Sequence, residues 1–287
     1  MPKLDGEGLG FCACQKYYLS VASDVTMITR NLYLMKKIIL LSCLIGAFSL
    51  HGKHHEEKKS LKAFMVTGGC CHDYPNQKNI ISEGINERVA TKWDIFFEMD
   101  EKKSKARLSE SGWADGYDYI VYNHCFAHEK DAAFVKSITD IHMAGKPAIA
   151  LHCAMHSYHW NIPVKEGEKK SWPAMLGASS KGHGPKAAIT VSKVKKNAKH
   201  PILKDMPDGW LTPEGELYNV QEIYKGTTVL AYGDNGRCDF PQAVAWVNTY
   251  GKGRIFSTTL GHHNSTMSTQ EYLNMLANAV RWITEKK

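Results

Sequence analysis

The sequence predicts an α/β fold in which a doubly wound, mainly parallel sheet of the flavodoxin-like type is extended by antiparallel strands near the C-terminus. Three observations indicate this class. The composition is that of a globular protein, with 43% hydrophobic and 23% charged residues. Strand-like and helix-like segments alternate with short links over residues 61–151, a pattern typical of a parallel sheet covered on both faces. The C-terminal half departs from that rhythm and contains a hairpin pattern.

The elements of the first half follow from apolar spacing and from glycine. A strand over 61–67 ends at Gly68-Gly69, and the next segment carries apolar residues at helical spacing. A later amphipathic helix ends at Gly145, a typical C-terminal stop. The further strands are predicted at 93–99, 117–122 and 147–151, and the two helices at 79–89 and 128–144.

The second half is predicted to contribute the antiparallel extension and a closing helix. Two apolar segments flank Tyr250-Gly-Lys-Gly253 and predict a hairpin of strands at 242–249 and 254–260. Segments 187–194 and 227–232 are also strand-like. The last helix is expected over residues 268–284, with Ser268 as its cap and Glu271 three residues later, because this segment has a continuous apolar face.

The start of the chain has the features of a targeting sequence. Residues 35–49 combine a basic start, a short apolar run and a small-x-small end, which predicts a signal peptide and export to the periplasm or the extracellular space. The apolar run is shorter than the roughly 20 residues of a membrane span. Cys43 lies in a weak lipoprotein-like box, so lipid anchoring is a minor alternative. Residues 1–34 are then an upstream extension, disordered or not translated, 50–60 a linker, and 61–287 a single domain.

Charge and cysteine usage exclude two classes of protein. The formal net charge of +7 falls to +4 over residues 60–287, with 28 basic against 24 acidic side chains, which is too mild to indicate a nucleic-acid partner. Five cysteines remain after the predicted signal peptide, and the absence of a CxxC pair argues against a zinc ribbon. Most of them are expected to be buried small hydrophobes. They are Cys70, Cys71, Cys125, Cys153 and Cys238. The oligomeric state stays open.

Short motifs from Lys62 to the end of the chain resemble the trehalose-utilisation (ThuA-like) family, which has the class I glutamine amidotransferase-like fold. The motifs include Thr67-Gly-Gly-Cys-Cys-His-Asp-Tyr74, Leu151-His152, Gly182-His183-Gly184, Glu216-Leu-Tyr218, Ala245 to Phe256 and Thr259-Leu-Gly-His262. The resemblance implies a role in carbohydrate metabolism, and the family is frequently labelled as a secreted glycosyl hydrolase.

One departure from the wider superfamily bears on function. Class I amidotransferases carry a nucleophilic cysteine in a Gly-x-Cys-x-Gly turn, whereas the stretch here is Ala150-Leu-His-Cys-Ala154 and aligns His152 with that nucleophile. The resemblance therefore argues against glutamine hydrolysis. Because neighbouring side chains at a strand end point to opposite faces, Cys153 is expected to be buried and structural.

The candidate site gathers polar side chains that follow predicted strands, where open α/β sheets carry their chemistry. Histidine exchanges protons near neutral pH and binds zinc-like ions. The catalytic candidates are His152, His72, Asp73, Glu216 and His262. The substrate-binding candidates are Tyr74, His183, Tyr218, His263 and Trp160. The candidate ligands for a divalent metal such as zinc, should one be bound, are His72, His152, His156 and His262. His124 is a second-rank candidate, and His142, His159 and His200 are expected to be structural or on the surface.

The resulting hypothesis is an exported enzyme that acts on a carbohydrate or an oxidised sugar by His and carboxylate acid–base chemistry, with or without a divalent metal. Hydrolase, lyase and isomerase chemistry all stay open, because only Asp73 and Glu216 qualify as the carboxylate pair that a glycosidase needs. Two alternatives remain at this stage. One is a noncatalytic sugar- or metal-binding protein, and the other is a cysteine hydrolase that uses Cys153.

Overall fold

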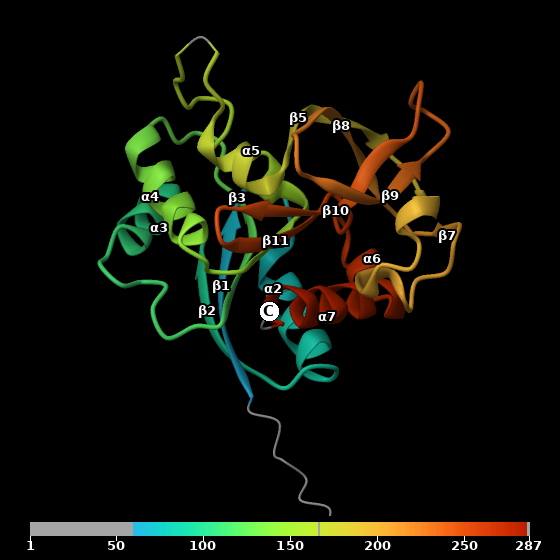
Figure 1. The fold of residues 1–287 in the computed structure, drawn as a ribbon, viewed down its shortest axis with the longest axis horizontal. Helices are drawn as coiled ribbons and strands as arrows, with labels where there is room; N and C mark the ends of the chain where they lie inside the picture. The colour runs from blue at the N-terminus through green and yellow to red at the C-terminus, as the bar shows by residue number, and fades with distance from the viewer. Residues whose placement is uncertain (1–59, 166, 286–287) are drawn as a thin grey trace, which may run out of the picture. The chain divides into compact units, whose positions relative to one another are not determined.

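The computed structural model describes residues 60–165 and 167–285, and within them a nine-stranded sheet runs in the order β2-β1-β3-β4-β11-β10-β9-β6-β7 (Figure 1). The pairs from β2 to β11 are parallel, and those from β11 to β7 are antiparallel. The strands are β1 Leu61–Gly69, β2 Thr91–Glu98, β3 Tyr119–Cys125, β4 Ala148–Leu151, β6 Thr190–Lys193, β7 Trp210–Leu211, β9 Thr228–Asp234, β10 Gln242–Tyr250 and β11 Gly253–Thr258. The predicted fold class, including its antiparallel extension, is confirmed.

Helices cover both faces of the parallel part of the sheet. They are α2 Tyr74–Asn86, α3 Glu101–Leu108, α4 Ala132–Met143, α5 Ser171–Leu176, α6 Asn264–Met267 and α7 Gln270–Thr284. Alternate side chains of β1 enter two different cores. Ala63 and Met65 share a core with α2 and α7, whereas Phe64 and Val66 share one with α3, α4 and α5. This burial on both sides explains why the central strands are continuous apolar runs.

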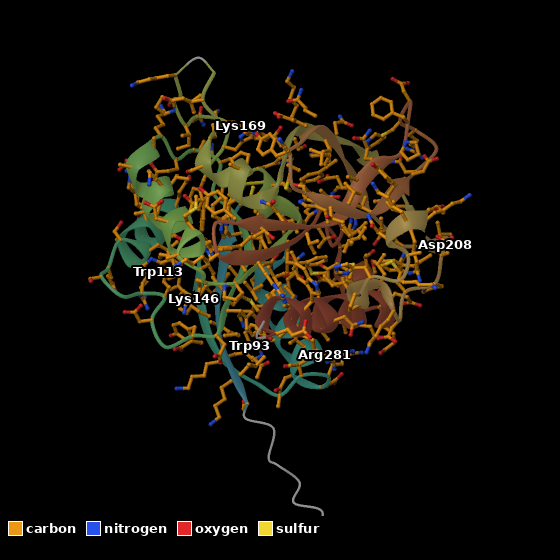
Figure 2. The ribbon with its side chains drawn as sticks, viewed as in Figure 1. Trp93, Trp113, Lys146, Lys169, Asp208 and Arg281 are labelled. Atoms are coloured by element: carbon orange, nitrogen blue, oxygen red, sulfur yellow. A yellow bond between two sulfur atoms is a disulfide. The ribbon has the colours of Figure 1, made fainter. Side chains whose placement is uncertain are left out.

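Side chains fill the space between the sheet and these helices, while the charged Lys169 and Asp208 lie at the periphery (Figure 2). A second, two-stranded antiparallel sheet joins β5 Ala178–Lys186 to β8 Glu216–Ile223. Its register pairs His183 with Tyr218. This small sheet was not among the elements predicted from the sequence, because the Pro-Glu-Gly segment before Glu216 is turn-like.

Several element boundaries also differ from prediction, and each has a local cause. Helix α2 begins five residues early, because Pro75 is tolerated in its first turn. Helix α4 begins only after Asp131, whose carboxylate accepts from the amides of Ala133 and Phe134. Helix α3 was missed because it has few apolar residues and buries only Ser104 and Leu108.

The final helix is interrupted at its expected cap. Ser268 ends the short helix α6, and the hydroxyl of Thr269 accepts from the amide of Tyr272 to begin α7. The predicted cap at Ser268 is therefore wrong by one residue. The cause is the extra turn of α6, which occupies Ser268 before the long helix starts.

The carboxyl ends of β1, β3, β4 and β11 meet along one edge of the sheet, because these four strands are parallel and adjacent. In the sheet, β2 lies on one side of β1, and β3, β4 and β11 lie on the other side of β1. Ligands of open α/β sheets bind at such a reversal of strand order. The predicted upstream extension, signal peptide and Cys43 lie outside the described residues, as does nearly all of the 50–60 linker. Within the described part of the chain, no helix has the length and apolarity needed to cross a membrane.

Candidate functional site

His152 lies at a sharp turn directly after β4. Its φ of 40° is in the left-handed region, which is uncommon for a residue with a side chain. Such strained positions are typical of functional sites at strand-to-helix turns. A short 3₁₀ helix, His152–Met155, continues the chain. The turn holds the imidazole above the sheet edge, where it is only 2% exposed.

One hydrogen bond fixes the protonation pattern of His152. Its Nδ1 lies 2.6 Å from the carbonyl oxygen of Thr259. Because a carbonyl only accepts, Nδ1 donates, and Nε2 is the ring nitrogen left to face the site. Nε2 lies 3.4 Å from Oε2 of Glu216. Nε2 of His152 is thus the atom available to a ligand in the site.

Two further histidines join His152 from neighbouring strand ends. His72 follows β1 and His262 follows β11, and their ring centroids lie 5.0 and 5.3 Å from that of His152 and 4.6 Å from each other. One nitrogen from each ring falls within 4.8 Å of the other two. The predicted strand-end histidines therefore converge at one place.

These rings carry buried nitrogens that have no hydrogen-bond partner among the described residues. They are both nitrogens of His72, Nε2 of His152 and Nδ1 of His262. A buried polar atom left without a partner costs about 1–3 kcal/mol, so native proteins rarely leave several together. The donor set therefore fits a group that is held between the three rings.

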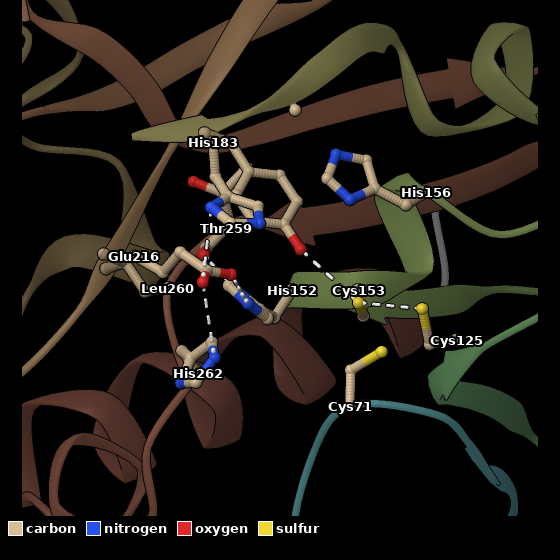
Figure 3. Close-up of polar contacts among 12 residues, drawn as sticks. Cys71, Cys125, His152, Cys153, His156, His183, Glu216, Thr259, Leu260 and His262 are labelled. Carbon is tan, nitrogen blue, oxygen red and sulfur yellow. Dashed lines mark hydrogen bonds and ion pairs between the residues drawn. The ribbon is translucent and has the colours of Figure 1, made fainter. Parts of the chain in front are cut away.

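Glu216 lies at the centre of the histidines (Figure 3). Its Oε1 is 3.3 Å from Nδ1 of His183 and 3.5 Å from Nε2 of His262, and the carboxylate belongs to a residue only 6% exposed. Burial favours the neutral acid, but the contact with His152 and the positive charges that His262, His152 and His183 carry when protonated outweigh it and lower the pKa of Glu216 to about 2. Glu216 is therefore a carboxylate at neutral pH.

The neighbouring imidazoles are held in the neutral form. Burial lowers the pKa of His262 to about 3. Burial, together with the charge of His152, lowers the pKa of His156 to about 3. An imidazole binds a metal only through an unprotonated nitrogen, so neutral rings beside a carboxylate match the chemistry of a zinc-like ion.

These groups border a cavity of about 380 Å³. His156 stacks on Tyr218 with ring centroids 4.2 Å apart and planes 3° apart, and Trp160 lies 4.7 Å from His156. Trp160 is 47% exposed, and the side chain of His183 is 43% exposed at the cavity mouth. The cavity therefore combines a polar, His-rich floor with an aromatic wall. Its lining includes His72, His156, Trp160, His183, Glu216, Tyr218 and His262.

Asp73 and His263 lie apart from this arrangement. They border a neighbouring cavity of about 580 Å³, which His72 and His262 also reach. Oδ2 of Asp73 accepts hydrogen bonds from Asn76 and Asn264, and these bonds lower the pKa of its exposed carboxyl. Asp73 does not line the cavity of Glu216, because its carboxylate is directed to Asn76 and Asn264. His262 borders both cavities, whereas His263 borders the neighbouring one and not that of Glu216.

Three further candidates take other places. His156 is outside the group of converging nitrogens, because a 3₁₀ turn after a left-handed residue does not align positions four apart as an α-helix does. Tyr74 was expected to bind substrate, but it is completely buried under the edge of His72. His124 is also completely buried, and burial lowers its pKa to about 3.

The sequence analysis missed a cluster of cysteines beside the histidines. Cys70 and Cys71 form a disulfide and are exposed, which corrects the expectation that they are buried hydrophobes. The thiol of Cys153 donates to Sγ of Cys125 at 3.1 Å, and this bond and burial raise the pKa of Cys153 far above its usual value. The signal was present in the sequence: each cysteine adjoins a strand end, as the histidines do.

Comparisons with known proteins agree with this fold. The family model described as ThuA, trehalose utilisation, matches residues 48–283. A search of curated proteins finds no match. A ThuA-like protein from Parabacteroides merdae ATCC 43184 has a similar structure, with a TM-score of 0.62 and 16% identity over 79% of this chain and 90% of that chain. One from Bacteroides uniformis ATCC 8492 has a TM-score of 0.58 and 17% identity over 78% and 92%. Since the family model spans most of its length, the chain belongs to the ThuA family of trehalose utilisation.

Proposed function

We propose that this ThuA-family protein is an exported enzyme that acts on a carbohydrate or an oxidised sugar, with a divalent metal ion held by His72, His152 and His262. The observation that carries the proposal is the convergence of three imidazoles with unpartnered nitrogens around an ionised carboxylate. Export rests on the signal-like pattern at residues 35–49. The family's description supports the carbohydrate class.

The donor set suits a zinc-like ion. Three His ligands with an open fourth position are a known arrangement of catalytic zinc, and such an ion polarises a sugar carbonyl or hydroxyl. The bond from Nδ1 of His152 to the Thr259 carbonyl orients the ring and fixes Nε2 as the ligand atom, as in other metal sites where the second ring nitrogen donates to oxygen.

Glu216 and His183 have different roles in the proposed reaction. A carboxylate with a pKa of about 2 is a weak base, so Glu216 acts as an anion that orients the imidazoles and accepts hydrogen bonds from sugar hydroxyls. His183 lies at the cavity mouth with Nδ1 3.3 Å from Oε1 of Glu216. It is the imidazole best placed to exchange a proton between substrate and solvent.

The aromatic wall supports a sugar ligand. Sugar rings present apolar faces that pack on aromatic side chains, while their hydroxyls need polar partners. Trp160 offers an exposed aromatic surface, and the stacked pair of His156 and Tyr218 continues it toward Glu216. The cavity of about 380 Å³ has room for a small sugar.

Two other mechanisms have less support. A retaining or inverting glycosidase needs two carboxyl groups across the scissile bond. Asp73 is engaged with two asparagines outside this cavity, which leaves Glu216 alone. A cysteine hydrolase needs a stabilised thiolate, and the pKa of Cys153 is raised by its hydrogen bond to Cys125 and by burial.

A substrate panel of glycosides, keto-sugars and other oxidised sugars tests the proposal with metal-reconstituted protein. The His152→Ala and Glu216→Gln variants are each expected to lower turnover by about 10²-fold or more, since both act on the reacting groups. The Cys238→Ser variant is the matched control and should keep wild-type turnover, because Cys238 lies outside the cluster of His ligands.

Binding of a sugar or a metal without turnover would contradict the proposed enzymatic function and would support the alternative of a sugar- or metal-binding protein. Equal turnover by wild type and His152→Ala would overturn the assignment of the site. N-terminal sequencing of exported protein tests the localisation separately: a start upstream of residue 35 would contradict the signal peptide.

A further inference from the structure

Four sulfur atoms gather at the carboxyl ends of three adjacent strands, beside the histidine site but separate from its ligand atoms. Cys70 and Cys71 follow β1. Cys125 is the last residue of β3, and Cys153 follows β4. The sulfurs of the first three lie within 4.8 Å of one another, and Sγ of Cys153 is 3.1 Å from that of Cys125. Figure 3 shows Cys71, Cys125 and Cys153 directing their sulfurs toward a common point.

The backbone holds the Cys70-Cys71 loop in this place. Gly69 has a φ of 88°, and a Cβ there would lie 2.2 Å from the carbonyl oxygen of Cys125, so only glycine allows the loop to approach β3 this closely. The amide of Cys70 donates to the same carbonyl at 3.4 Å. Cys71 itself is left-handed, with a φ of 84°. A non-glycine residue in that region indicates a functional constraint.

The surroundings of the sulfurs suit a soft ion. Cys125 and Cys153 are 7% and 6% exposed and pack with the fully buried Tyr74, whereas Cys70 and Cys71 reach solvent. The outer pair is therefore accessible and the inner pair is shielded. A zinc–sulfur distance of about 2.3 Å places the sulfurs of a tetrahedral site about 3.8 Å apart. The sulfurs of Cys125 and Cys153 are 3.1 Å apart and those of Cys70 and Cys71 are bonded, so an ion requires the disulfide to open and the sulfurs to move slightly apart.

We propose that Cys70, Cys71 and Cys125, with Cys153 as the fourth sulfur, form a thiolate site for one closed-shell thiophilic ion, Cu(I) or Zn(II). The site can bind this ion once the Cys70–Cys71 disulfide is reduced. Sulfur ligands select such ions. A dithiol reductant supplies two electrons and two protons to the disulfide and becomes a disulfide itself. The two freed thiols then lose their protons as they bind the ion.

The closed disulfide leaves only Cys125 and Cys153 as thiols in the cluster, which is too few for a three-sulfur site. Reduction thus decides whether the site exists. The site shares the cavity wall with the proposed sugar site but uses none of its imidazole ligands. The inference therefore stands independently of the reaction catalysed.

The test uses the full chain with Cys12, Cys14, Cys43 and Cys238 changed to Ser, so that the cluster holds the only thiols. The metal-free protein is reduced with a phosphine under argon and titrated with Cu(I) or Zn(II) against a colorimetric chelator. We expect one sulfur-bound ion per chain, seen for Cu(I), or for Co(II) in place of Zn(II), as thiolate-to-metal charge-transfer absorption. The oxidised protein should lack this band.

Variants separate this site from the histidine site. Changing both Cys70 and Cys71 to Ser in that background should abolish the charge-transfer band, whereas His152→Ala should keep it. The two ions distinguish a copper site from a zinc site, and a band with either supports the proposal. The absence of a band with both ions, or a band that persists in the double Ser variant, would overturn it. A folded far-ultraviolet circular dichroism spectrum for each variant keeps the comparison valid.

Discussion

Two buried histidines flank β4, and their surroundings differ. His142 lies before the strand, with Nδ1 2.7 Å from the carbonyl oxygen of Lys146 and Nε2 2.8 Å from the hydroxyl of Tyr122. His152 lies directly after the strand, with Nδ1 bonded to Thr259 and no hydrogen-bond partner for Nε2 among the described residues. Both are at most 2% exposed. Burial alone therefore does not distinguish a structural histidine from a candidate ligand, whereas an unpartnered nitrogen does.

The largest expected difference is in the stability of the metal-free protein. His142→Ala removes the imidazole, leaves the Lys146 carbonyl and the Tyr122 hydroxyl without their partner and creates a cavity, so it should lower the free energy of unfolding by about 3 kcal/mol. His152→Ala loses one hydrogen bond but also removes an unpartnered nitrogen, so we expect about half that loss. Urea unfolding measures both values. A larger loss of the free energy of unfolding for His152→Ala than for His142→Ala would contradict the distinction between a structural His142 and a candidate ligand at His152.

The pH dependence of stability sharpens the same contrast. Burial lowers the pKa of His142 to about 4 from the model-compound value of 6.5, against the opposing hydrogen bond to Lys146. Between pH 6.5 and pH 4 the unfolded chain therefore binds a proton at His142 that the folded chain does not bind. The contribution of the neutral His142 to the free energy of unfolding is complete above pH 6.5 and decreases as the pH falls toward 4. One such group contributes a slope of up to about 1.4 kcal/mol per pH unit.

The His142→Gln variant should lose that part of the slope. Urea midpoints measured from pH 7 to pH 4 for this variant and the wild type supply the comparison. An unchanged slope would mean that His142 is not the neutral, fully bonded group inferred from its two contacts.

The smallest effect is expected at Asp73. Its carboxylate is exposed and accepts hydrogen bonds from Asn76 and Asn264, so Asp73→Ala should leave the free energy of unfolding nearly unchanged. Turnover should stay within about twofold of the wild type. A loss of turnover comparable with that of Glu216→Gln would return Asp73 to the catalytic group.

The sequence predicted the parts of the fold that depend on buried strands. Apolar runs identified β1, β3, β4 and the β10–β11 hairpin, because strands buried on both faces leave a continuous signal. Helix α3 was missed because it lies on the surface with only Ser104 and Leu108 buried. The β5–β8 sheet was missed because its pairing joins residues far apart in the chain, with repeated register shifts.

The residues of the candidate site were likewise predicted correctly where they follow buried strands and not where their position depends on other contacts. Strand ends brought His72, His152 and His262 together as expected, since adjacent parallel strands end at one edge. Asp73 was misplaced because its direction depends on the start of α2. The cysteine cluster has no CxxC spacing in the sequence, because these sulfurs meet only through the order of the strands in the sheet.

The central claim is that the three strand-end histidines hold a divalent ion. Zinc binding to metal-stripped protein with the Cys70–Cys71 disulfide closed tests it most directly, because the sulfur site is then absent. We predict one zinc per wild-type chain, the same for His142→Gln, and an affinity lower by on the order of 100-fold for His152→Ala. No zinc bound to the wild type, or equal affinity in the wild type and His152→Ala, would contradict the account.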